Sequence, residues 1–73
     1  MATSKEIAKR LMETRVIAML AKEKGFSEKE AMRLFYNSVT YRWFADDKYG
    51  VAREGVDAIL YRVLNELDGD LTT

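Results

Sequence analysis

The stretch Ser27–Phe44 constrains the fold of this chain more than any other part of the sequence. It contains five of the eight aromatic residues, and Phe26 immediately precedes it. Aromatic side chains carry the largest apolar area each, so in a chain of 73 residues they set where the core lies. We therefore expect a core around Phe35, Trp43 and Phe44.

The first helix is predicted to span residues 4–24. Thr3 and Glu6 have the spacing of a capping box, and Gly25 is a typical left-handed terminator. One apolar stripe, expected to face inward, consists of Ala8, Leu11, Met12, Val16, Met19 and Leu20. A second, smaller face consists of Ile7, Thr14, Ala18 and Ala21. Its small central residues would let another helix come close, which is typical of a central helix in a bundle.

Two further helices are predicted inside the aromatic stretch. Ser27 and Glu30 repeat the capping-box spacing, and a break is expected at Asn37-Ser38. One continuous helix through Asp46 remains the alternative, because no Gly or Pro interrupts the stretch. With the break, a short helix over 41–46 would direct Trp43 and Phe44 into the core.

The C-terminal part is predicted to form a turn, an extended bridge and a last helix. Asp47–Gly50 has the composition of a tight turn, and Val51–Arg53 is expected to be extended. The last helix begins after Gly55 and ends at Gly69, and residues 70–73 should fray. Its apolar face comprises Val56, Ile59, Leu60, Val63, Leu64 and Leu67. This face is broader than one contact requires, so a homodimer or a bound partner would cover it.

These elements together predict an all-α fold. We expect a compact bundle of three main helices plus one short helix, with a short extended segment before the last helix. The whole chain, residues 1–73, would be a single helical domain with an ordered core at about 4–68.

The composition argues against an enzyme or a metal protein. The chain has no cysteine and no histidine, which removes thiolate zinc sites, thiol nucleophiles and the commonest general base. The acidic residues 46–57 lack the alternation of an EF-hand loop, because Lys48 and Gly50 occupy ligand positions. We expect no catalytic residue, cofactor, metal or small-molecule substrate. We also expect no membrane span and a cytoplasmic location.

Charge is unevenly spread along the chain. Residues 1–37 carry eight basic and five acidic side chains, and residues 38–73 carry four and seven. Two solvent-exposed faces of opposite charge are the simpler interpretation of this asymmetry. The more specific interpretation is electrostatic steering between copies of the chain or toward a charged partner. A helix-turn-helix-like regulator, with Lys29, Arg33 and Arg42 on phosphates, is the alternative function. Glu28 and Glu30 dilute the basic surface that nucleic-acid binding needs.

Protein–protein interaction is the function that these residues favour. Tyrosine and tryptophan near arginine are the residue types that anchor interfaces. The candidate interaction surface therefore comprises Tyr36, Tyr41, Arg42, Tyr61 and Arg62. A homo-oligomer or a cognate protein partner would bind there.

The middle of the chain resembles a group of small, functionally uncharacterised bacterial helical proteins. The resemblance covers roughly residues 7–67. The matching features are Ser27, Glu30, Ala31, Leu34-Phe35-Tyr36, Ser38, Thr40-Tyr41, Asp46-Asp47, Gly50 and the aliphatic helix Val56–Leu67. Trp43-Phe44 stands where aliphatic residues are expected, and Val56 stands where proline is expected. The resemblance implies a compact helical domain without an established activity. Some members look to be encoded beside toxin-like enzymes, which implies an antitoxin-like role.

Overall fold

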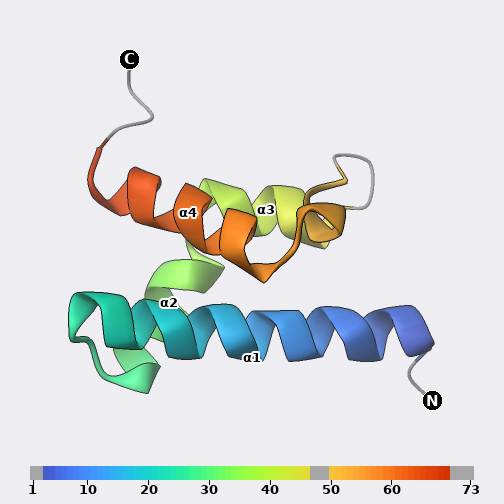
Figure 1. The fold of residues 1–73 in the computed structure, drawn as a ribbon, viewed down its shortest axis with the longest axis horizontal. Coiled ribbons are helices and arrows are strands. Elements are labelled where there is room, and N and C mark those ends of the chain that lie inside the picture. Colours follow the sequence, from blue (N-terminus) through green and yellow to red (C-terminus); the bar gives the residue numbers. More distant parts are fainter. Residues whose placement is uncertain (1–2, 47–49, 70–73) are drawn as a thin grey trace.

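The computed structural model describes residues 3–46 and 50–69 and shows an all-α bundle. Its elements are α1 (Ser4–Lys24), α2 (Glu28–Tyr36), α3 (Val39–Ala45), the 3₁₀ helix η2 (Val51–Glu54) and α4 (Val56–Leu67). α1 lies along one side of the molecule, α3 and α4 lie on the other, and α2 connects the two levels (Figure 1). α1 packs against α2 and α4, while α4 also packs against α3 and η2.

The local signals at the ends of α1 and α2 act as the sequence predicts. The Thr3 side chain accepts a hydrogen bond from the Glu6 amide, and Ser27 accepts one from the Glu30 amide. Gly25 adopts φ 71°, and its amide donates to the Ala21 carbonyl. A side chain at this left-handed position would be strained, so glycine is the residue that ends α1 cleanly.

The helix is interrupted between α2 and α3, so the alternative of one continuous helix through Asp46 is wrong. Asn37 closes α2, because its amide and its side-chain nitrogen both donate to the Arg33 carbonyl. Ser38 then caps α3 by accepting from the Tyr41 amide at 3.0 Å. α3 therefore starts at Val39, two residues earlier than predicted, and ends at Ala45.

The core is formed by one face of each α-helix. Its buried apolar residues are Val16, Ile17, Leu20, Ala31, Phe35, Phe44, Ile59, Leu60 and Val63. Phe35 and Phe44 occupy it as predicted, but the prediction for Trp43 is wrong, because this side chain is 36% exposed. Successive helical residues point about 100° apart. Phe44 shares the inward face with Thr40 one turn earlier, which turns Trp43 outward.

The predicted inward stripe of α1 is also partly wrong. Ile17 is buried beside Val16 and Leu20, whereas Leu11 and Met19 are exposed. The helix is thus rotated toward Ile17 relative to the prediction. α1 packs against both α2 and α4, and Val16, Ile17 and Leu20 belong to the core that it shares with these helices.

The segment before α4 is helical and not extended, which corrects another prediction. Gly50 has φ 65°, and its carbonyl accepts a hydrogen bond from the Arg53 amide at 3.1 Å. This local bond closes a 3₁₀ turn, so the segment needs no partner strand. Residues 47–49 of the predicted turn and 70–73 of the predicted frayed tail lie outside the described residues.

Candidate interaction surfaces

Tyr36 and Tyr41 come together at the junction of α2 and α3. Their rings meet edge to face with centroids 4.9 Å apart, and Tyr41 also packs against the buried Phe35 at 5.3 Å. Burial raises the pKa of both phenols, and the nearby Glu13 carboxylate raises it further. Tyr36 keeps 42% of its surface exposed. This pair therefore exposes the Tyr36 ring at the surface, while Tyr41 holds it against the core through Phe35.

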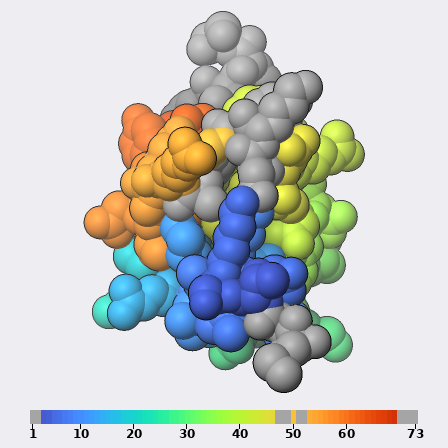
Figure 2. All heavy atoms as spheres, turned by 90° about the vertical axis from the view of Figure 1, so that its right-hand side faces the viewer, coloured from blue at the N-terminus to red at the C-terminus, as the bar shows by residue number. Residues whose placement is uncertain are grey.

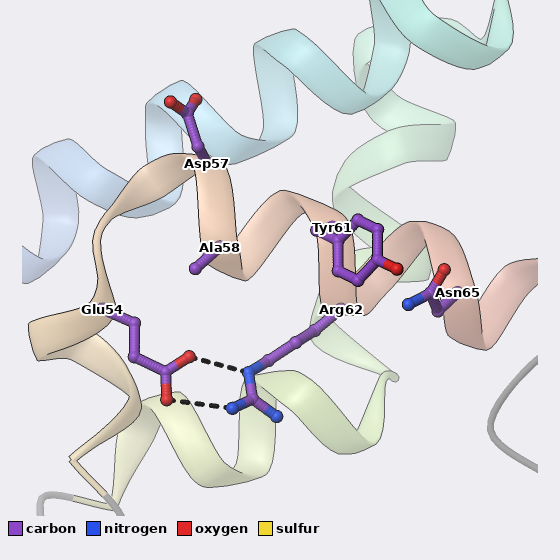
Figure 3. A pocket seen from close by; sticks show the side chains of 6 residues that line it. All are labelled: Glu54, Asp57, Ala58, Tyr61, Arg62 and Asn65. Carbon is purple, nitrogen blue, oxygen red and sulfur yellow. Dashed lines mark hydrogen bonds and ion pairs between the residues drawn. The ribbon is translucent and has the colours of Figure 1, made fainter.

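Tyr61 and Arg62 form a second surface, on the outer side of α4 (Figure 3). Tyr61 is 66% exposed. Arg62 donates two hydrogen bonds of 2.9 Å to the two carboxylate oxygens of Glu54 in η2. These residues line a depression of about 570 Å³ together with Asp57, Ala58 and Asn65. The bidentate pair fixes η2 against α4 and leaves Tyr61 beside it in solvent.

The five residues predicted as one interaction surface thus lie in separate places. Tyr41 lines a depression at α1 and α3, whereas Tyr61 and Arg62 line the one at α4 and η2. Arg42 is exposed on α3 and lines neither depression. The five residues therefore do not line one common depression.

Acidification is expected to weaken the contact between Glu54 and Arg62. The hydrogen bonds from Arg62 lower the pKa of Glu54 below its ordinary value. The Glu54 carboxylate is therefore protonated less readily in the folded chain than in the unfolded chain. The pair stabilises the fold above the ordinary glutamate pKa, and this contribution is lost as the pH falls through the lowered pKa.

Urea unfolding between about pH 7 and about pH 2 measures this effect. The free energy of unfolding of the wild type should fall more steeply with acid than that of Glu54→Gln. Both side chains are partly exposed, so the difference should be small and should shrink with salt. Parallel curves for the two proteins would show that the pair contributes nothing.

Glu66 makes a contact that the sequence did not indicate. Its carboxylate accepts hydrogen bonds from the Val39 amide at 2.7 Å and the Thr40 amide at 2.9 Å. The Thr40 hydroxyl also donates to it. Thr40 is buried, and the amides are the unsatisfied donors at the start of α3. Glu66 therefore joins α4 to the start of α3.

α1 presents an uncovered apolar face, and the sequence pattern assigned one of its residues, Leu11, to the inward stripe. Ile7 is 51% exposed and Leu11 is 63% exposed. Ala18 and Met19 continue this face toward α4 and line a depression of about 490 Å³ with Arg15, Val56 and Asp57. The first turns of α1 form part of the molecular surface, between the η2–α4 segment and α3 (Figure 2). Of the second face that the sequence predicted for this helix, Ile7, Thr14 and Ala18 are exposed, whereas Ala21 packs against the core.

Most of the broad face of α4, in contrast, is covered within the chain, and Leu67 at its C-terminal end is 37% exposed. Ile59, Leu60 and Val63 are buried, and Val56 and Leu64 pack against the same core. The breadth of this face therefore reflects packing within the chain for Ile59, Leu60 and Val63. Exposed large apolar side chains lie on all four α-helices, and α1 carries three of them, Ile7, Leu11 and Met19.

Within residues 3–46 and 50–69, no group of three or more Asp, Glu, His or Cys side chains could hold a metal ion. In the same part of the chain, no helix is both long and apolar enough to cross a membrane. Comparison with models of protein families, with curated proteins and with solved structures found no match.

Proposed function

We propose that this chain is a small cytoplasmic protein–protein interaction module. It would act through self-association, a cognate partner or both, and an antitoxin is one form that such a partner-binding protein takes. The observation that carries the proposal is the exposed apolar face of α1. Single exposed apolar residues are ordinary on protein surfaces, but here Ile7 and Leu11 share one face of a helix with Ala18.

Covering this face supplies a driving force for association. Removing apolar surface from water contributes about 25 cal/mol per Å², from which the entropic cost of association is subtracted. Burial of Leu11 in a partner would therefore contribute favourably, since it stands in water in the single chain. Chains of this length bury a modest share of their surface, and association is a common way to stabilise them further.

The structure favours this function over a helix-turn-helix-like regulator. In that alternative α3 would read the nucleic acid, but its first amides already bind the Glu66 carboxylate. Thr40 and Phe44 are buried, and Arg42 is the one cation that α3 offers. A negative charge at the start of the reading helix would repel phosphates.

Light scattering over a hundredfold range of concentration, with the chain alone and with lysate-purified partner, tests the proposed function. We expect a mass above that of one chain in at least one of these conditions. Leu11→Glu should abolish the increase, because it places a charge in the apolar face. Met32→Glu makes the same charge change at an exposed apolar residue of α2 and should leave the mass unchanged. A mass of one chain under all conditions, or equal effects of the two variants, would contradict the proposal.

A further inference from the structure

α1 carries a regular seam along its exposed face, which we call the outer seam and define as Ile7, Leu11, Thr14 and Ala18. The steps of four, three and four residues place the four side chains on one side of the helix. All four are exposed. The Thr14 hydroxyl donates to the Arg10 carbonyl at 3.0 Å, so its polar group is satisfied within α1. Its methyl group is left for an apolar contact.

The shape of the outer seam fits another helix. Ile7 and Leu11 project from the first half of α1, whereas Thr14 and Ala18 are small and form a shallow stretch in the second half. Small residues let a second helix approach closely, and the distance between helix axes depends on the side chains at the contact. The depression of about 490 Å³ beside Ala18 gives room for larger side chains of that helix.

The charges bordering the outer seam indicate what kind of helix this is. Arg15 and Lys22 follow the seam on the α4 side, and Arg10 follows it on the other side. The glutamates of α1 lie farther around the helix from the seam than these cations. Glu6 and Glu13 line a depression with Arg10 and Tyr41, and Glu23 shares one with Leu60 of α4. Asp57 of α4 lines one depression with Arg15, and Glu23 lines another with Lys22. Two copies of the seam would bring the cations of both borders together.

We propose that the outer seam binds an amphipathic helix of another protein, with glutamate or aspartate along both borders of its apolar stripe. This inference rests on the proposed function and names the class of partner. Opposite charges at the positions that flank a helical seam set partner choice and orientation. The partner needs bulky apolar residues opposite Thr14 and Ala18 and smaller ones opposite Ile7 and Leu11.

Two other anionic partners fit the face less well. A nucleic acid would place its phosphates over Ile7 and Leu11, which lie between the cations and offer no donor. A lipid surface takes up a continuous face of bulky apolar side chains, whereas the second half of the outer seam, Thr14 and Ala18, is small. Both are outcomes of the experiment below.

The test uses two synthetic helical peptides of about three heptads with the same apolar stripe. One carries glutamate at all flanking positions and the other carries lysine, so that neither pairs with itself at neutral pH. Fluorescence anisotropy measures the binding of each to the intact chain. We expect the glutamate peptide to bind at least about tenfold more tightly, because its borders complement the cations of α1. Its affinity should fall as salt is added.

Variants locate the binding. Leu11→Glu should weaken the binding of the glutamate peptide at least about tenfold, and Met32→Glu should not change its affinity. The double variant Arg15→Glu, Lys22→Glu should shift the preference toward the lysine peptide, and loss of folding cannot produce such a gain. Circular dichroism confirms that each variant is helical.

Equal affinity for the two peptides, or binding of neither, would overturn the acidic-helix inference. Binding to vesicles with anionic lipid or to duplex DNA that is lost in Leu11→Glu would also overturn it. A tight dimer that forms through the outer seam and is not dissociated by the peptides would do the same. A dimer lost in Leu11→Glu would leave the proposed function standing. A chain that stays single and binds no partner in the light-scattering experiment would remove both.

Discussion

Replacing Phe35 with alanine is expected to leave the chain largely unfolded at room temperature. The side chain is fully buried, and its ring packs against Tyr41 and Phe44 from α3. Truncation of a buried phenylalanine costs about 3–5 kcal/mol, which includes the cavity that it leaves. A single core of this size supplies a total stability of only about 3–5 kcal/mol. The cost of one substitution therefore equals the stability of the whole domain.

Far-ultraviolet circular dichroism in a urea titration measures this loss. The wild type should show a cooperative transition, and Phe35→Ala should show little helix even without urea. Phe35→Leu fills more of the cavity and should retain a transition at lower urea. Tyr61→Ala is the matched control, because this aromatic ring is exposed and its loss should change stability by no more than about 0.5 kcal/mol. A wild-type-like midpoint for Phe35→Ala would show that the core lies elsewhere.

The helix boundaries could be predicted because their signals are local. Thr3, Ser27 and Gly25 act on amides and carbonyls within a few residues, so their spacing in the sequence is enough. The break at Asn37-Ser38 is of the same kind. These caps determine where helices begin and end, and they act in the same way whichever face is buried.

The direction that each helix faces was harder to predict. In α3, Trp43 and Phe44 are adjacent and similarly apolar, so the sequence does not say which is buried. In α1, Leu11 and Met19 are as apolar as Ile17, and two alternative stripes are consistent with the pattern. The choice depends on where α2 and α4 pack, which is a property of the whole bundle. Two of the candidate interaction residues, Tyr36 and Tyr61, are exposed. The sequence pattern grouped Ile7, Thr14 and Ala18 of the outer seam on one face, but it assigned Leu11 to the inward stripe.

Glu66 shows most clearly what the sequence could not indicate. Its partners Thr40 and Val39 are 26 and 27 residues away, and no local pattern joins an acid in one helix to the start of another. The contact exists because α3 and α4 pack side by side and bring the amides and the carboxylate together. Ser38 satisfies one orphan amide of α3, and Glu66 satisfies two more. A seven-residue helix is too short to be stable alone, so its formation depends on such contacts.

Glu66→Ala is therefore expected to destabilise the fold more than any other substitution of a charged residue in α4. Hydrogen bonds to a charged group contribute about 1.5–3 kcal/mol, and their loss also leaves the Thr40 hydroxyl and amide without this acceptor. Urea unfolding should show this loss in the free energy of unfolding. Hydrogen exchange should show faster exchange at the amides of Val39 and Thr40, because the start of α3 opens.

The control and the double-mutant cycle separate this contact from a general effect of charge. Glu23→Ala removes the same charge from an exposed position in α1 and should change stability by no more than about 0.5 kcal/mol. Thr40→Val removes the hydroxyl donor, so its effect and that of Glu66→Ala should not add when the two are combined. Additive effects, together with unchanged exchange at Val39, would mean that α3 is held by its buried Phe44 alone. In that case the hydrogen bonds of Glu66 would be a consequence of the packing of α3 on α4 and not one of its causes.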